Sequence, residues 1–390
     1  MSRIHLVLTD DWELRGNGSG SMPRIQFETM ERLVEVYERH GLKASFSVEV
    51  MQQLKHLEAG AAEPALLDLA RRWEGHVREA LRRGHDVQLH VHPQWHGAER
   101  RDGRWHLSAA WSILDHPKDR VAAMIRTCRE YLEAALRPVD PDYRCVAFRS
   151  GSWCLAPGEA ILDLLIENGI VFDTSIVQGI HYDRLVRLDY RRLEEPFLPY
   201  YPDRRDARRV AADRGPLVCV PTHSFFYRPA AKVRDALARR MARVPGTGHP
   251  VAGDDAAWRS PDSVPIPEAD TDSYDDWKMG GGGNGGPRGG LRALLHYYLK
   301  STHYVSNLAG LSFVLMREML RDIRARAAAS GWTEVPVVLQ NHTKDLGWLD
   351  PIERFAALLA ASPDIEVITL RELARRLQAG RYPVRFGRAA

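Results

Sequence analysis

Two histidines and a pair of adjacent aspartates are the residues of this chain best suited to bind a metal ion. His90 and His92 lie in the run His90-Val91-His92-Pro93, and Asp10 and Asp11 follow the apolar residues 4–8. Residues i and i+2 of a strand point to the same side, so the two imidazoles would face one site. Two imidazoles and a carboxylate form a common hydrolytic zinc arrangement, with water in the open position.

The other candidate ligands near these residues leave alternatives open. His92 and His96 are four residues apart and would share one face of a helix, in which Pro93 is tolerated in the first turn. His96 is therefore the alternative to His92. Glu13 follows the double aspartate, and we expect it to be peripheral rather than a ligand.

The double aspartate is suited to two different roles. Adjacent carboxylates at a strand end cannot both turn the same way, so one could bind the metal while the other accepts a proton from water. Two close negative charges also raise at least one of the two pKa values, which suits a general base.

Strand and helix patterns alternate along most of the chain, which indicates parallel βα units. The pattern alone does not choose between a closed barrel and an open sheet. The predicted strands cover residues 4–8, 43–50, 86–92, 144–149, 170–173, 217–221, 336–340 and 366–369. The predicted helices cover residues 27–40, 66–83, 120–136, 158–168, 317–330, 351–361 and 370–377.

Clusters of polar residues follow the predicted strands. Active sites of parallel α/β barrels lie at the carboxyl ends of the strands, so these clusters should meet in one site. They are residues 9–13, 90–92, 149–153, 173–175, 222–223 and 340–342.

Residues 203–310 interrupt the alternation, and we interpret them as an insertion in a single domain that spans residues 1–390. A basic stretch at 228–243 has helical character, and an acidic stretch follows at 254–276. Residues 279–290 include eight glycines in twelve positions. Such a run cannot supply side chains to a core.

The overall composition excludes several classes of protein. Among 390 residues the formal net charge is +3, which gives no reason to expect nucleic acid or an anionic membrane as a partner. The chain shows no signal-peptide pattern and no long apolar run, so we expect a cytoplasmic protein without a membrane span. The oligomeric state is not indicated.

The order of the motifs resembles the polysaccharide deacetylase superfamily (NodB homology, carbohydrate esterase 4). The similarity rests on Asp-Asp, His-x-His-Pro, Arg-Ser-Gly-Ser-Trp at 149–153, Asp-Thr-Ser at 173–175, a late histidine and the closing run 368–374. More narrowly, Gln-Leu-His-Val-His-Pro-Gln-Trp at 88–95 resembles the WbmS-type branch, which is associated with bacterial surface-polysaccharide loci. The similarity covers nearly the whole chain apart from residues 203–310.

The resemblance implies a distorted (β/α)7 barrel and the removal of an acetyl group from an N-acetylated sugar. It implies a divalent metal, Zn2+ or another such as Co2+, Ni2+, Mn2+ or Fe2+. It assigns the general base to Asp10 and the metal ligands to Asp11, His90 and His92. It also makes Arg149 the residue that orients Asp10 and His342 the general acid. Alternatives are a deacylase of an O-acetyl ester or non-sugar amide, and a non-catalytic barrel that binds a partner.

The resemblance and the strand-end clusters also suggest residues along the substrate groove. The resemblance places Trp153 and Asp173 there, and Trp12 stands where the family usually has glycine after the double aspartate, which would narrow the site. His223 follows a strand and could either line the rim of the site or simply pack against other side chains. The family's two histidines are usually four apart, and its usual Arg-x-Pro is Arg-Ser-Gly in this chain.

Overall fold

The computed structural model describes residues 2–183, 186–241, 298–299 and 302–387. Within these residues, a parallel sheet of eight strands forms the centre of the molecule. The strands run in the order β10-β7-β6-β3-β2-β1-β13, and β14 pairs with β1 off this path. They are β1 (Arg3–Trp12), β2 (Ser45–Glu49), β3 (Asp86–Val91), β6 (Ala147–Ser150), β7 (Phe172–Asp173), β10 (Val218–Cys219), β13 (Glu334–His342) and β14 (Ile365–Val367).

The sheet curls until its two ends approach each other. A parallel bridge joins Thr222, just after β10, to Val338 in β13, and the backbone N–H of His223 donates to the Val338 carbonyl at 2.8 Å. These contacts join the two edges as in a distorted barrel, so the α/β fold class predicted from the sequence is confirmed.

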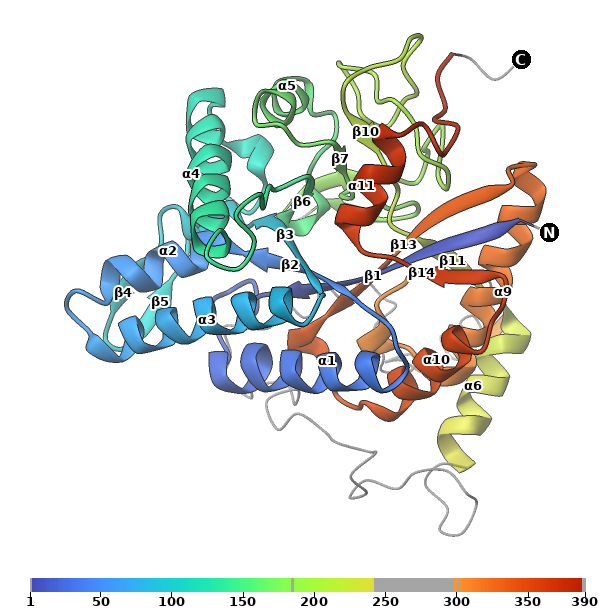
Figure 1. Cartoon of the computed structure of the whole chain (residues 1–390), viewed down its shortest axis with the longest axis horizontal. Coiled ribbons are helices and arrows are strands. Elements are labelled where there is room, and N and C mark those ends of the chain that lie inside the picture. Colours follow the sequence, from blue (N-terminus) through green and yellow to red (C-terminus); the bar gives the residue numbers. More distant parts are fainter. Residues whose placement is uncertain (1, 184–185, 242–297, 300–301, 388–390) are drawn as a thin grey trace.

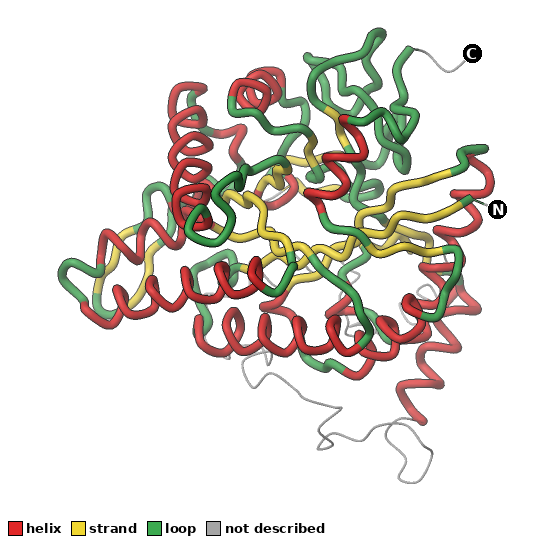
Figure 2. Tube along the Cα trace, in the orientation of Figure 1, coloured by secondary structure: helices red, strands yellow, loops and turns green. Residues whose placement is uncertain are grey.

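Helices surround the sheet on its outer side (Figures 1 and 2). Their apolar faces pack on the strands, as at α1, where Leu33, Val36 and Tyr37 join a core with Ile4, Leu6 and Leu8. The helices are α1 (Thr29–Arg39), α2 (Val50–Ala59), α3 (Pro64–Arg82), α4 (Lys118–Leu136), α5 (Glu159–Glu167), α6 (Pro229–Met241), α9 (Phe313–Ser330), α10 (Asp350–Ala360) and α11 (Leu370–Gln378). A π-helical segment, η1 (Met22–Glu28), leads directly into α1. No helix of the described residues is long and apolar enough to cross a membrane.

Among the described residues, three antiparallel strand pairs lie outside the main sheet. They are β4–β5 (Glu99–Arg101 and Arg104–His106), β8–β9 (His181–Asp183 and Arg187–Asp189) and β11–β12 (Ser224–Tyr227 and Thr302–Val305). Within the predicted insertion at 203–310, β10 belongs to the main sheet and α6 covers most of the basic stretch. The acidic stretch at 254–276 and the glycine-rich run at 279–290 lie outside the described residues.

Candidate metal centre

The carboxyl end of β1 separates its side chains onto two faces. Thr9 and Asp11 point to the inside of the curled sheet, where both contact Arg149 of β6. Asp10 points to the helix layer, where the Tyr37 hydroxyl of α1 is 3.3 Å from its Oδ2. This alternation is the ordinary two-residue period of a strand. The two aspartates therefore lie in different parts of the structure.

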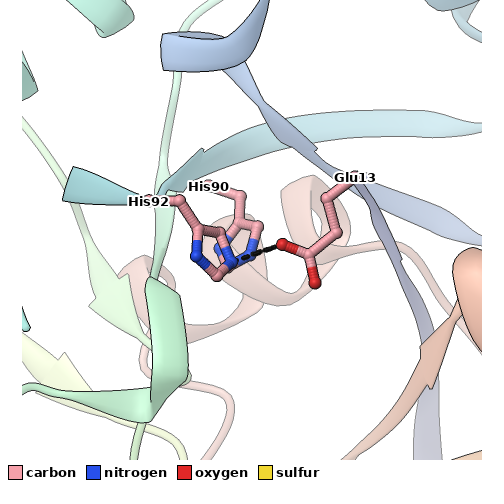
Figure 3. A group of neighbouring side chains, drawn as sticks. All are labelled: Glu13, His90 and His92. Carbon is pink, nitrogen blue, oxygen red and sulfur yellow. Dashed lines mark hydrogen bonds and ion pairs between the residues drawn. The ribbon is translucent and has the colours of Figure 1, made fainter. Parts of the chain in front are cut away.

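Glu13, His90 and His92 form a buried group that could hold a metal ion (Figure 3). One ligand atom from each residue lies within 4.8 Å of the other two. The Glu13 Oε2 atom is 3.2 Å from His90 Nε2 and also contacts His92 Nε2. Asp11 is not a member of this group, whereas Glu13, predicted to be peripheral, is at its centre.

The hydrogen bonds of His90 leave its Nε2 atom suited to a metal. Its Nδ1 atom lies 2.9 Å from the Arg149 carbonyl oxygen, which can only accept, so Nδ1 carries the proton. The Nε2 atom, 3.2 Å from a Glu13 oxygen, then faces another electron-pair donor. Two such atoms at this distance need a cation or a proton between them, and a divalent metal fits the donor set of two imidazoles and a carboxylate.

Lys344 contacts the Glu13 carboxylate oxygen that does not face the histidines. Its ammonium group, buried in the short helix η9 (Thr343–Asp345), pairs with the second carboxylate oxygen, Oε1. Burial alone would raise the pKa of Glu13, but its contacts with His92, Lys344 and His90 hold that pKa well below its ordinary value. Glu13 is therefore ionised, with Oε1 held by Lys344 and Oε2 directed at the histidines.

Asp11 lies beside this group, surrounded by positive and hydrogen-bonding partners. Its Oδ1 atom pairs with the Arg149 guanidinium, and its Oδ2 atom accepts from the Gln340 amide at 2.8 Å. Burial opposes ionisation, but the charges of Arg149, His90 and His342 bring the pKa of Asp11 below its ordinary value. Arg149 thus contacts Asp11 rather than Asp10.

His342 and Trp153 complete the inner face of the site. His342 Nε2 lies 3.5 Å from Asp11 Oδ2 and 3.1 Å from the Gln340 amide nitrogen. Trp153 donates from its indole nitrogen to Gln340 Oε1 at 2.9 Å, and its ring meets that of His342 edge-on, with centroids 5.9 Å apart. Its other ring neighbour is Tyr182 of the β8–β9 hairpin, stacked at 6.4 Å.

The backbone around Trp153 is unusual in two ways. Ser152 and Trp153 both have a φ of 56°, the left-handed region that L residues rarely adopt. Gly151 lies against His92, since a Cβ atom there would be 2.8 Å from the imidazole ring. Glycine at position 151 lets the loop approach His92, because any larger residue would collide with the imidazole ring.

Asp10 and Trp12 lie on the outer face of β1, away from the metal group. Asp10 accepts from the Asn341 amide at 2.6 Å, and burial raises its pKa to about 7. The Trp12 indole donates to the Gln26 carbonyl at 2.7 Å and packs on Phe27. The structure thus positions neither residue beside Glu13 and the histidines.

Three other candidate residues also lie outside the group. Asp173 is fully buried, and its two oxygens accept from the backbone N–H and hydroxyl of Ser175 at 2.7 Å each. His223 packs between Phe197 and Phe225, and burial holds its pKa well below the ordinary value. His96 is exposed, and its ring faces that of His116.

Comparison with known proteins supports the fold. No protein-family model matches the chain, and no curated protein matches its sequence. Among solved structures, a protein described as a polysaccharide deacetylase from Mycobacterium smegmatis aligns with a TM-score of 0.51 and 14% identity, over 100% of this chain and 95% of that one. A protein described as a glycoside hydrolase/deacetylase from Parabacteroides distasonis aligns with a TM-score of 0.51 and 14% identity, over 98% of this chain and 73% of that one. At these identities the likeness concerns the fold.

Proposed function

We propose that this chain is a metal-dependent deacetylase of the polysaccharide deacetylase superfamily. The observation that carries the proposal is the arrangement of Glu13, His90 and His92 beside an Arg149-paired Asp11, at the carboxyl ends of barrel strands. This is where parallel α/β barrels hold their catalytic residues. The ordered motifs of the sequence support the same superfamily.

The geometry favours a metal-ligand assignment that differs by two residues from the one implied by the resemblance. We assign the ligands to Glu13, His90 and His92, because one ligand atom of each lies within 4.8 Å of the other two. A divalent metal held there would supply a Lewis acid and lower the pKa of water to about 7. Zinc is our first choice, since imidazole and carboxylate are among its usual ligands and two imidazoles with one carboxylate are a known catalytic set.

Asp11 is the better candidate for the general base. Arg149 holds it ionised, and its Oδ2 atom lies on the side of the site that His342 shares. In amide hydrolysis, Asp11 would accept a proton from the attacking water, and Arg149 would stabilise the carboxylate before that transfer. His342 would protonate the departing amine, for which an imidazole near neutral pH is well suited.

The substrate that we propose is an N-acetylated sugar used in the synthesis of bacterial surface polysaccharide. The resemblance of residues 88–95 to the WbmS-type branch supports this narrower choice. Trp153 offers an aromatic ring beside His342, as expected for a groove that binds a sugar ring. The cytoplasmic location stays a prediction.

The test combines metal analysis with product detection. The purified full-length chain is analysed for bound metal, stripped with a chelator, reloaded with zinc and assayed for acetate release from N-acetylated sugars and nucleotide sugars. We expect stoichiometric metal and acetate release that stops on stripping and returns with zinc. Release only from O-acetyl esters or non-sugar amides would replace the sugar substrate, and a chain that binds no metal would favour a non-catalytic binding barrel.

A further inference from the structure

Helix α2 begins directly at the end of β2, the strand that lies between β1 and β3. The last residues of these neighbours that pair with β2 are Trp12 on β1 and His90 on β3. Glu13 and His92 come after these pairs. Two of the three proposed ligands therefore stand where the backbone ladder to β2 has ended, and the sheet no longer fixes their separation.

Beyond the last paired residues, two side chains from the start of α2 accept hydrogen bonds from the backbone that follows β1 and β3. Gln52 Oε1 accepts from the backbone N–H of Leu14, the residue after Glu13, at 3.1 Å. Glu49 Oε1 accepts from the backbone N–H of His92 at 3.1 Å. Both side chains are fully buried, so these bonds satisfy backbone groups that have no access to water.

The two side chains are themselves held firmly. Glu49 is the N-cap of α2 and accepts from the backbone N–H groups of Met51 and Gln52. The Gln52 amide donates to Gln26 Oε1 at 2.9 Å. Gln26 in turn binds the main chain and the indole of Trp12. The network thus connects the β1 end, the α2 start and the β3 end through buried hydrogen bonds.

We propose that Glu49 and Gln52 are positioning residues for the metal centre, which set the separation of Glu13 from His92. The inference rests on the proposed metal site. Each bond holds the backbone at a ligand or one residue from it, so losing either would let the ligands drift apart. Residues that orient metal ligands govern affinity for the metal, and their loss typically costs about 10- to 100-fold in that affinity.

The neighbouring residue of α2 supplies a matched control. Gln53 is as buried as Gln52, but its amide donates to the Ala70 carbonyl at 2.9 Å and the Tyr131 hydroxyl at 2.8 Å, which belong to α3 and α4. Gln52→Met and Gln53→Met therefore remove the same polar group from adjacent positions of one helix. Methionine keeps the length of the side chain, so neither change opens a large cavity.

The experiment measures the zinc dissociation constant of both full-length variants by competition with a chelator, alongside the thermal unfolding of the metal-free proteins. We expect both variants to lose some thermal stability, and Gln52→Met alone to weaken zinc binding by about 10- to 100-fold. Equal zinc affinity in the two variants and the wild type would overturn the inference while leaving the proposed function intact. A wild-type chain that binds no zinc would overturn the proposed function, and the inference with it.

Discussion

The two faces of β1 at its carboxyl end place adjacent aspartates in opposite surroundings. Asp11, on the inner face, meets Arg149 and His342. Asp10, on the outer face, meets the neutral groups of Tyr37 and Asn341. Both carboxylates are buried, yet the pKa of Asp11 lies below its ordinary value and burial raises that of Asp10 to about 7. Burial is common to both, so the neighbouring charges make the difference.

The contrast shows that the face of the strand, rather than the order in the sequence, decides which carboxylate lies beside Arg149 and His342. Asp11 and Glu13 share the inner face, two residues apart. Asp10 shares the outer face with Trp12 and contacts the helix layer. The inner carboxylate therefore lies beside the proposed metal group, whereas the outer one lies against α1.

The largest expected effect is the loss of a metal ligand from the inner face. His90→Ala removes one of two imidazoles that contact Glu13, so we expect it to abolish the proposed metal binding and the proposed deacetylase activity. His96→Ala, which alters an exposed residue, should retain both. Metal content and acetate release measure the two outcomes. Retention of metal by His90→Ala together with its loss in His96→Ala would instead identify His96 as a ligand.

The next effect distinguishes the two aspartates directly. Asp11→Asn should retain zinc and lose roughly 10²- to 10⁴-fold in kcat, the usual range for a general base. Asp10→Asn should change kcat less than about 5-fold, because its amide can still accept from Asn341 on the outer face. Measuring kcat and metal content for both variants decides between the assignments. The reverse result, an inactive Asp10→Asn that binds zinc and an Asp11→Asn without metal, would restore the roles implied by the resemblance.

The sequence was sufficient to predict the fold and most of the inner-face residues. The alternating pattern predicted β1, β3, β6 and β13, and the motifs at their ends brought Asp11, both histidines, Arg149 and His342 to one place. Helix α2 was not predicted, because it starts at Val50 without a loop after β2. A strand that passes directly into a helix leaves no turn residues to mark the change.

Glu13 was expected from the sequence to be peripheral, but the inner-face positions of Glu13 and Gln340 follow from a rule already applied to the histidines. Two-residue alternation places Glu13 on the face of Asp11, and Gln340 on the face of His342. The roles of Lys344 and Gln52 could not be found in this way. Their contacts with Glu13 and Leu14 join segments far apart in the sequence, and no local spacing predicts such pairs.

The outer-face carboxylate of Asp10 should also make the free energy of unfolding depend on pH. Burial raises the pKa of Asp10 to about 7 in the folded chain, from an ordinary value of 3.8, so between these pH values the folded state keeps a proton that the unfolded state has lost. Stability is therefore lost as pH rises from about 4 to 7, by up to roughly 4 kcal/mol from this group. Above pH 7 the contribution is constant. Asparagine at this position does not titrate.

Chemical unfolding of wild type and Asp10→Asn across this pH range measures that contribution. The free energy of unfolding of the wild type should fall relative to that of the variant between about pH 4 and pH 7, since only the wild type loses the proton. Parallel curves for the two proteins would show that Asp10 ionises normally. The contrast between the two faces of β1 would then rest on geometry alone.

The smallest expected effect concerns the inner-face hydrogen bond between Trp153 and Gln340. Trp153→Phe removes the indole N–H that holds Gln340 Oε1 but keeps an aromatic ring beside His342. Gln340 orients Asp11 and His342, so losing one bond of about 1 kcal/mol should lower kcat by about 2- to 10-fold and leave zinc binding unchanged. Gln53→Met, which loses buried hydrogen bonds to α3 and α4 away from the inner face, is the control and should affect stability more than kcat. Equal losses of kcat in the two variants would mean that the inner face has no special sensitivity to the indole bond.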